Sequence, residues 1–260
     1  QGVLHTLQTD HITGKPLKVI HYGNINGKDT RHLSRRQTVA DNLHISPDAV
    51  TDNDMAEYRQ TVRRQLGFSD DDFVFIFIGR IVTDKGMTEL SRAMKTLSGR
   101  HPNVRLLLVG TMEKGDAIAD DVHDYLLNSQ NVKYVGSKTD VRPFLTAADA
   151  LVFPSYREGF PNVPMEAGAM DLPCIVTDIN GSNEIIRDGL NGKIIEAPLD
   201  GHGRHVHDIT PALTETMEWF ILHPAEVSRM SRNARRMIKE RYEQRDVWNG
   251  LLAFYNELKD

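Results

Sequence analysis

The sequence of 260 residues contains a single cysteine, Cys174, so no disulfide can form within the chain. Nothing therefore indicates a small secreted domain held together by disulfides. Cys174 begins a short apolar run, and we expect it to be a buried apolar residue. Long hydrophobic runs are missing too: no segment is long enough to span a bilayer, and the N-terminus does not resemble a signal peptide.

The sequence also has no excess of basic residues. Its net charge is −5, so no global basic field attracts nucleic acid or an anionic membrane. It lacks a P-loop, a G-x-G-x-x-G dinucleotide motif and an H-E-x-x-H zinc motif. Hydrophobic residues make up 40% and charged residues 26%, which is typical of a soluble globular protein. We expect a cytoplasmic protein that binds no nucleic acid.

From residue 73 onward, short apolar runs alternate with longer amphipathic stretches. The runs are apolar at nearly every position, as is typical of strands that are covered on both faces. Repeated strand–helix units predict an α/β fold, with a Rossmann-like, doubly wound parallel sheet and right-handed crossovers. The predicted strands span residues 73–79, 104–110, 132–136, 150–155, 174–178 and 193–197, and residues 17–23 form a further candidate.

The flanks of this region have their own patterns. Residues 54–67 are predicted to form a helix that ends at Gly67, and the polar, turn-rich segment 23–52 before it is predicted to be a linker. A helix near residues 227–242 has an Arg-rich face, which we expect to be solvated, although contact with anionic lipid is an alternative. The last helix, 247–258, is rich in aromatic and apolar residues.

Ligands of an open parallel sheet bind at the carboxyl ends of its strands. The first strong strand is followed by Arg80 and then by Lys85, at the start of a helix. These two cations suit a diphosphate, and a surface ion pair is the alternative. Gly110, Gly136 and Lys138 follow the next two strands, and glycine lets a ligand approach the backbone closely.

The segment after the fourth strand contains two glutamates around a predicted helix start. Pro164 suits the first turn of a helix, which places Asn162 or Val163 at the cap. The free amides of such a terminus suit a phosphate. Glu166, in the expected first turn, could accept two ribose hydroxyls, and Glu158 could accept sugar hydroxyls or oppose positive charge in an oxocarbenium-like transition state. Alternatively, Glu166 only stabilises its helix and Glu158 is solvated.

Together these residues resemble the retaining glycosyltransferases of family 4, which have the GT-B fold, and in particular the C-terminal, donor-binding half of bacterial enzymes that build surface polysaccharides. The pair Glu158 and Glu166 matches the two glutamates of that family, which are separated by seven residues. Arg80 and Lys85 match its diphosphate-binding residues. Segments 149–153 and 178–192 resemble the strand before the signature and the turn and helix after it, and segment 20–29 resembles its Asn-Gly-x-Asp interdomain linker.

The resemblance implies a role for each matched residue. Arg80 and Lys85 would bind the nucleotide diphosphate and stabilise its departure, Glu166 would hold the ribose, and Glu158 would contact the donor sugar. The remaining donor-binding residues would be Gly159, Phe160, Asn162 and Val163 through their amides, Gly136 and Lys138 beside the base, and Gly110. No cofactor or metal is expected, because Arg, Lys and the helix end supply positive charge. Pro161 replaces a glycine of many members and removes one backbone donor.

The implied reaction transfers a sugar from a nucleotide diphosphate sugar, commonly a UDP-sugar, to a glycan or lipid-linked acceptor. Residues 1–53 would be the end of an N-terminal acceptor-binding domain and the linker, 54–246 the nucleotide-sugar domain, and 247–260 a helix that packs on the N-terminal domain. The sequence begins with Gln1, and we expect it to be a piece of a longer protein that is inactive alone. Peripheral membrane association of the full-length enzyme stays open.

Two alternatives are a non-catalytic sugar-nucleotide-binding module and a sugar-nucleotide epimerase of GT-B type. Two metal motifs are also weighed. Residues Asp70–Asp72 resemble a metal-binding Asp-x-Asp motif, but they precede their strand, so we expect a solvated turn. The three histidines of segment 202–207 could bind zinc only with Asp200 or Asp208, and we expect a surface loop.

Overall fold

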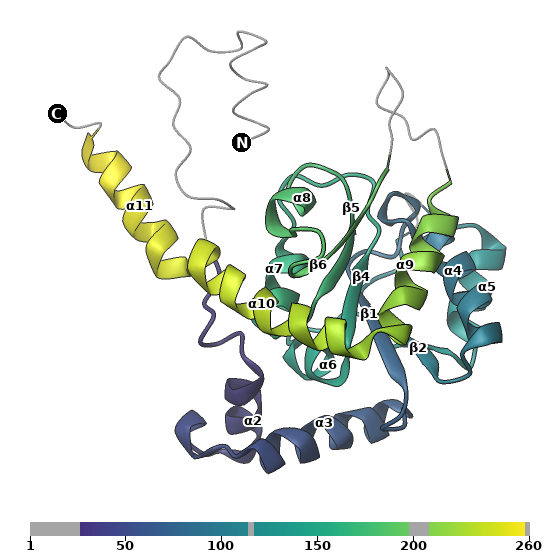
Figure 1. Cartoon of the computed structure of the whole chain (residues 1–260), viewed down its shortest axis with the longest axis horizontal. Coiled ribbons are helices and arrows are strands. Elements are labelled where there is room, and N and C mark those ends of the chain that lie inside the picture. The colour runs from purple at the N-terminus through teal and green to yellow at the C-terminus, as the bar shows by residue number, and fades with distance from the viewer. Residues whose placement is uncertain (1–26, 114–116, 198–207, 258–260) are drawn as a thin grey trace, which may run out of the picture.

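A computed structural model of the chain describes residues 27–113, 117–197 and 208–257. The candidate strand 17–23 and the histidines of segment 202–207 lie outside these ranges. The described chain forms a parallel sheet with helices on both of its faces (Figure 1). This confirms the predicted Rossmann-like α/β fold.

The sheet has six strands in the order β3-β2-β1-β4-β5-β6, all parallel. The strands are β1 Phe73–Ile78, β2 Val104–Val109, β3 Val132–Tyr134, β4 Ala150–Phe153, β5 Cys174–Thr177 and β6 Gly192–Ile195. The strands β4 and β5 are buried at every position, as their apolar runs predict. Strand β3 is shorter than predicted, because it lies at the edge and pairs with only Leu106–Leu108 of β2.

Helices connect the strands and cover the sheet. They are α2 Arg35–Leu43, α3 Asp52–Leu66, α4 Met87–Arg100, α5 Asp120–Asn128, α6 Arg142–Ala147, α7 Asn162–Ala169, α8 Ser182–Ile185, α9 Thr210–Leu222, α10 Pro224–Tyr242 and α11 Gln244–Glu257, with 3-10 turns η1 Pro47–Ala49 and η2 Thr83–Lys85. Helix α4 packs against α9, and α7 packs against α10 on the other face (Figure 1). Both layers enclose one hydrophobic core, which includes the fully buried Cys174, as expected.

The prediction for the segment before α3 is partly wrong. Helix α3 itself is confirmed, with a capping box between Thr51 and Asp54 at its start and Gly67 in the left-handed conformation at its end. However, the supposed linker 23–52 contains α2, whose first turn is capped by the hydroxyl of Ser34. The helix forms because its small apolar residues, Val39 among them, are buried in a cluster of their own.

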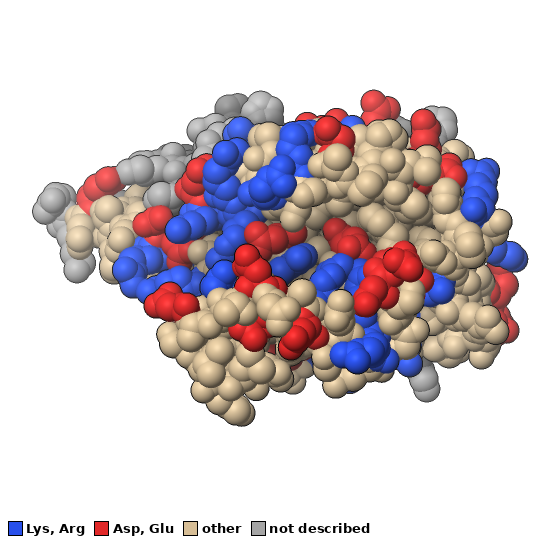
Figure 2. All heavy atoms as spheres, turned by 60° about the horizontal axis from the view of Figure 1, so that its bottom comes forward, with Lys and Arg blue, Asp and Glu red and all other residues tan. Residues whose placement is uncertain are grey.

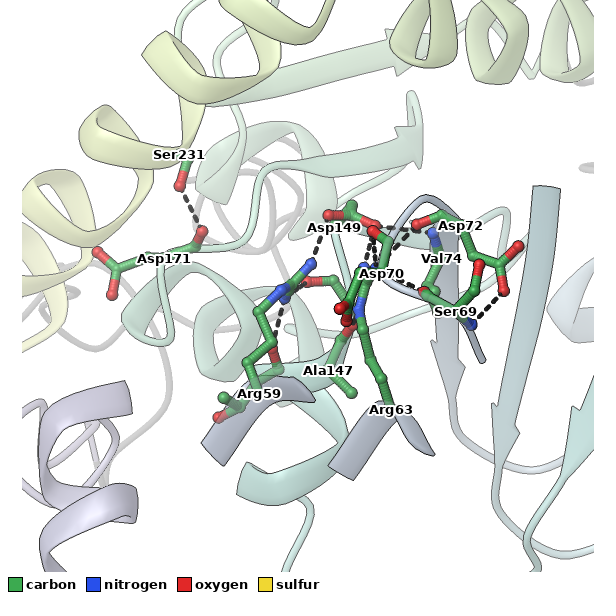
Figure 3. Close-up of polar contacts among 12 residues, drawn as sticks. Arg59, Arg63, Ser69, Asp70, Asp72, Val74, Ala147, Asp149, Asp171 and Ser231 are labelled. Atoms are coloured by element: carbon green, nitrogen blue, oxygen red, sulfur yellow. Dashed lines mark hydrogen bonds and ion pairs between the residues drawn. The ribbon is translucent and has the colours of Figure 1, made fainter. Parts of the chain in front are cut away.

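A partly buried ionic cluster joins α3 to the amino ends of β1 and β4 (Figure 3). The carboxylate of Asp149 accepts hydrogen bonds from Arg59 Nη2 at 2.6 Å, Arg63 Nη2 at 2.7 Å and the amide of Val74 at 2.8 Å. Arg63 has a side chain only 3% exposed, so this guanidinium depends on protein partners for its hydrogen bonds. On the side of the molecule turned forward in Figure 2, acidic and basic side chains intermingle.

The same edge corrects the expectation for residues Asp70–Asp72. Asp70 and Asp71 are exposed, as expected, but Asp72 is 4% exposed and is not part of a solvated turn. Its Oδ2 accepts from the amide of Ser69 at 2.8 Å, and its Oδ1 lies 3.1 Å from Arg105 Nη2. The carboxylate is buried because a cation of β2 and a turn amide compensate for the loss of water.

The two C-terminal helices differ in their surroundings. The Arg-rich face of α10 was expected to be solvated, and for Arg235 this expectation is wrong. Its guanidinium donates to the carbonyl oxygens of Thr30 at 2.8 Å, Leu33 at 2.9 Å and Ala169. Helix α11 leads away from the sheet (Figure 1). About half or more of the surface of its large apolar residues Trp248, Leu252 and Tyr255 is exposed. In the described ranges, no helix combines the length and apolar character needed to cross a membrane.

Candidate functional site

The residues singled out from the sequence follow the carboxyl ends of four adjacent strands. Gly79, after β1, donates its amide to Val109 O at 3.0 Å. Gly110, after β2, donates to Gly136 O, also at 3.0 Å, so the turns that follow β1, β2 and β3 lie next to one another. The loop of residues 154–161 follows β4 at the same edge. The topology therefore gathers the candidate residues where ligands of such sheets bind.

The structure brings Lys85 and Glu158 into direct contact. Lys85 Nζ lies 2.6 Å from Glu158 Oε1 and 3.2 Å from both Ser155 Oγ and the carbonyl oxygen of Arg157. The Lys85 side chain is only 11% exposed and that of Glu158 16%, so the pair is largely shielded from water. Two residues that are 73 positions apart thus form one polar centre between η2 and the loop after β4.

A glycine makes this approach sterically feasible. Gly86 has φ +70°, and a Cβ atom there would lie 2.2 Å from the carbonyl oxygen of Pro154. Any other residue would push the start of α4 away from the β4 loop. A hydrogen bond from the amide of Tyr156 to Asp84 O, 2.9 Å long, holds the same two segments together. Burial of the Tyr156 phenol raises its pKa, and a hydrogen bond to Glu89 raises it further, so the phenol stays protonated.

The start of α7 departs slightly from the expected position. The helix begins at Asn162 with Pro161 as its cap, which is one or two residues earlier than the expected cap at Asn162 or Val163. Pro161 itself makes no side-chain capping hydrogen bond. Glu166 is therefore the fifth residue of the helix, outside the first turn, and the expected stabilisation by the helix dipole is weaker, because that effect fades after the first turn.

Glu166 has an unexpected partner. Its Oε1 lies 2.6 Å from Lys28 Nζ, and the two side chains are 23% and 14% exposed. Lys28 belongs to the segment before α2, and it was not singled out from the sequence. It occupies the variable position of the Asn-Gly-x-Asp pattern, so the pattern gave no reason to select it.

Arg80 pairs with Glu113, which lines a cavity near this edge. Its Nη1 is 3.1 Å from Glu113 Oε2, and both side chains are about half exposed (51% and 42%). Besides Glu113, this cavity of 320 Å³ is lined by Ile81, Met112, Ala117, Ile118, Asp120 and His123. Glu113 and this cavity were not predicted from the sequence, although their position just after β2 could have indicated them.

The other candidate residues lie around this centre with different surroundings. Lys138 Nζ is 6.0 Å from the centroid of the Phe144 ring on α6. The ring of Phe160 meets that of Tyr242 edge-on, with 5.8 Å between centroids, so α10 anchors the loop that contains Gly159. Val163 is partly buried against the core. Among the residues that the structure describes, no group of three or more His, Cys, Asp or Glu side chains could hold a metal ion.

Strand order and polar edge together define a Rossmann-like domain of the kind found in GT-B proteins. The chain belongs to the family of glycosyl transferases group 1, whose family model matches residues 58–237. It is similar to the capsular polysaccharide biosynthesis glycosyltransferase CapM of Staphylococcus aureus, with 30% identity over 187 residues, covering 72% of this chain and 47% of CapM.

Two further proteins are similar to the chain. A UDP-Gal:alpha-D-GlcNAc-diphosphoundecaprenol alpha-1,3-galactosyltransferase of Escherichia coli is 30% identical over 136 residues, covering 50% of this chain and 34% of that enzyme. The crystal structure of HepE from Anabaena, in complex with UDP-glucose, matches with a TM-score of 0.69 and 20% identity, over 89% of this chain and 56% of HepE. The chain spans less than half the length of these two curated relatives.

Proposed function

We propose that the chain is the donor-binding, C-terminal domain of a retaining glycosyltransferase of family 4. The full-length enzyme would transfer a sugar from a nucleotide diphosphate sugar, with UDP as the preferred nucleotide, to a glycan or lipid-linked acceptor. The observation that carries this proposal is the shielded pair of Lys85 and Glu158, 2.6 Å apart at the carboxyl edge of the sheet. The name of the E. coli relative, which includes a UDP-sugar and a diphosphoundecaprenol, supports the choice of donor and acceptor.

The chemistry of Lys85 fits departure of a diphosphate. Negative charge grows on the leaving diphosphate as the bond to the sugar breaks, and a preorganised ammonium group stabilises that charge without a cost of reorganisation. The loop contacts hold the ammonium of Lys85 in place before any ligand arrives. We assign Arg80, on the same sheet edge, to the same diphosphate, where its guanidinium would exchange Glu113 for phosphate oxygens.

The chemistry of Glu158 fits the sugar. Its Oε1 is engaged by Lys85, and we assign its carboxylate to hydroxyls of the donor sugar and to positive charge in an oxocarbenium-like transition state. Glu166 would accept ribose hydroxyls, and the start of α7 would face the phosphate. Because Arg80, Lys85 and the helix end supply positive charge, the proposal includes no metal. We also place the full-length enzyme in the cytoplasm, where nucleotide sugars and the inner face of the membrane are both accessible.

Calorimetric titration of the 260-residue chain with UDP, GDP and ADP tests the donor site. We expect one of them to bind, and Lys85→Ala to weaken that binding by about tenfold to a hundredfold, as for loss of a charge-assisted contact. Lys95→Ala removes the same charge from an exposed position of α4 and should leave affinity unchanged. The proposal is wrong if none of the three nucleotides binds at millimolar concentration.

A test of the role of Glu158 requires the full-length protein, because the proposed acceptor domain would take part in transfer. Glu158→Ala should abolish sugar transfer but spare nucleotide affinity within about threefold. Transfer at the wild-type rate would contradict the assigned role. Conversion of the donor to its epimer in the absence of acceptor would instead favour an epimerase.

A further inference from the structure

A lysine from the start of the described chain reaches the donor site. Lys28 Nζ lies 2.6 Å from Glu166 Oε1, although the residues are 138 positions apart. The lysine side chain is 14% exposed, so most of its stem and head is covered by protein. A contact this short between opposite charges with limited access to water is stronger than an exposed surface pair.

The backbone around Lys28 is fixed by the junction between α10 and α11. The amide of Lys28 donates to Tyr242 O at 2.8 Å, and the amide of Gln244 donates to Lys28 O at 3.0 Å. Gly27 has φ +57°, and a Cβ atom there would lie 2.6 Å from Gln244 Cα, so only glycine permits this approach. The lysine therefore projects toward Glu166 from an anchored position.

The ion pairs at this edge show why a cation is needed beside Glu166. Each of three carboxylates is matched by one cation: Glu113 by Arg80, Glu158 by Lys85 and Glu166 by Lys28. A nucleotide diphosphate adds at least two negative charges to such a site. Without Lys28, the carboxylate of Glu166 would have no counterion while the anionic diphosphate binds nearby, and the like charges would repel.

We propose that Lys28 is a positioning residue of the donor site, which neutralises and orients Glu166 so that a diphosphate can bind next to a carboxylate. One oxygen of Glu166 is held by the ammonium, and its other oxygen stays available to ribose hydroxyls. The proposal rests on the proposed donor function. It assigns an electrostatic role to a residue outside the segment that the family model matches, which starts at residue 58.

The test compares ligands of increasing charge. The nucleotide that binds most tightly among UDP, GDP and ADP is titrated along with its monophosphate and its nucleoside. Lys28→Met keeps the apolar stem and removes the charge, and it should weaken diphosphate binding by about tenfold but nucleoside binding by less than about threefold, because Coulomb energy scales with ligand charge. Lys28→Arg retains the charge and should stay within about threefold of the wild type. Lys95→Met is the control for an exposed charge.

A double variant tests the neutralisation itself. Lys28→Met combined with Glu166→Gln removes both charges and restores a net charge of zero at the pair, so its ratio of diphosphate to nucleoside affinity should return to within about threefold of the wild-type value. Glu166→Gln alone should raise the ratio of diphosphate to nucleoside affinity, and this readout does not depend on the stability of the Lys28 variant.

Three results would overturn the inference: equal losses for diphosphate and nucleoside, a double variant whose ratio of diphosphate to nucleoside affinity stays as low as that of Lys28→Met, or a Glu166→Gln protein with an unaltered ratio. The proposed function fails separately, if the wild-type chain binds none of the three nucleotides. If the wild type binds and Lys28→Met binds equally well, only the role of Lys28 is wrong.

Discussion

Removal of the Asp149 carboxylate should destabilise the domain more than loss of an ordinary surface charge. Asp149 accepts from Arg59, Arg63 and the amide of Val74 at 2.6–2.8 Å, and it connects α3 to β1 and β4 (Figure 3). In Asp149→Ala, the largest cost comes from Arg63, whose side chain is 3% exposed and would retain a buried charge without its counterion.

The magnitude follows from the burial of each partner. A buried guanidinium that keeps its carbonyl acceptors but loses its counterion costs about 2–3 kcal/mol, and an unsatisfied amide of Val74 about 1 kcal/mol. Arg59 is 24% exposed at its side chain, so its share is discounted to less than about 1 kcal/mol by solvent screening. We expect Asp149→Ala to lower the free energy of unfolding by about 4 kcal/mol. Burial lowers the pKa of Arg59 to about 10, although the neighbouring Asp149 carboxylate opposes this shift.

Equilibrium unfolding in urea measures this loss as a shift of the midpoint at constant slope. Asp70→Ala is the matched control, because Asp70 is an exposed aspartate of the turn at the same edge, and its carbonyl oxygen rather than its side chain accepts from Arg63. The control should change stability by less than about 0.5 kcal/mol. A loss below about 1 kcal/mol for Asp149→Ala would refute the reasoning, since the cluster would then behave as an exposed ion pair.

Two further predictions concern other buried contacts. Gly86→Ala should lower the free energy of unfolding by about 1–3 kcal/mol and also weaken nucleotide binding, because its Cβ would displace Lys85 from the β4 loop. Gly99→Ala, inside the helix α4 that Gly86 precedes, places a Cβ where nothing lies within 4 Å and should be neutral or stabilising. Equal effects of the two substitutions would contradict the steric argument. Cys174 is fully buried and burial raises the pKa of its thiol, so a disulfide reagent such as DTNB should not react with the folded chain and should react once per chain after denaturation; rapid reaction of the folded chain would be inconsistent with this burial.

The sequence alone predicted the features that depend on local pattern. Apolar runs identified the six strands of the sheet. The signal is strongest in β1, β2, β4 and β5, because strands covered on both faces need apolar side chains at almost every position. Helix α3 was found from its apolar spacing and from Gly67 at its end. The polar edge of the sheet was predicted for a similar reason, since the carboxyl ends of parallel strands come together whatever their distance along the chain.

Only the tertiary structure decided which charges meet. Lys28 contacts Glu166 and Lys85 contacts Glu158 across 138 and 73 positions, and no local periodicity encodes such pairs. Asp72 shows the same limit of sequence-based prediction. A run of aspartates predicts a solvated turn, but folding places Arg105 of β2 beside this carboxylate. The burial of an apolar side chain can be predicted from its own chemistry. A charged one is buried only where folding supplies a partner, and that partner is chosen by the packing of distant segments.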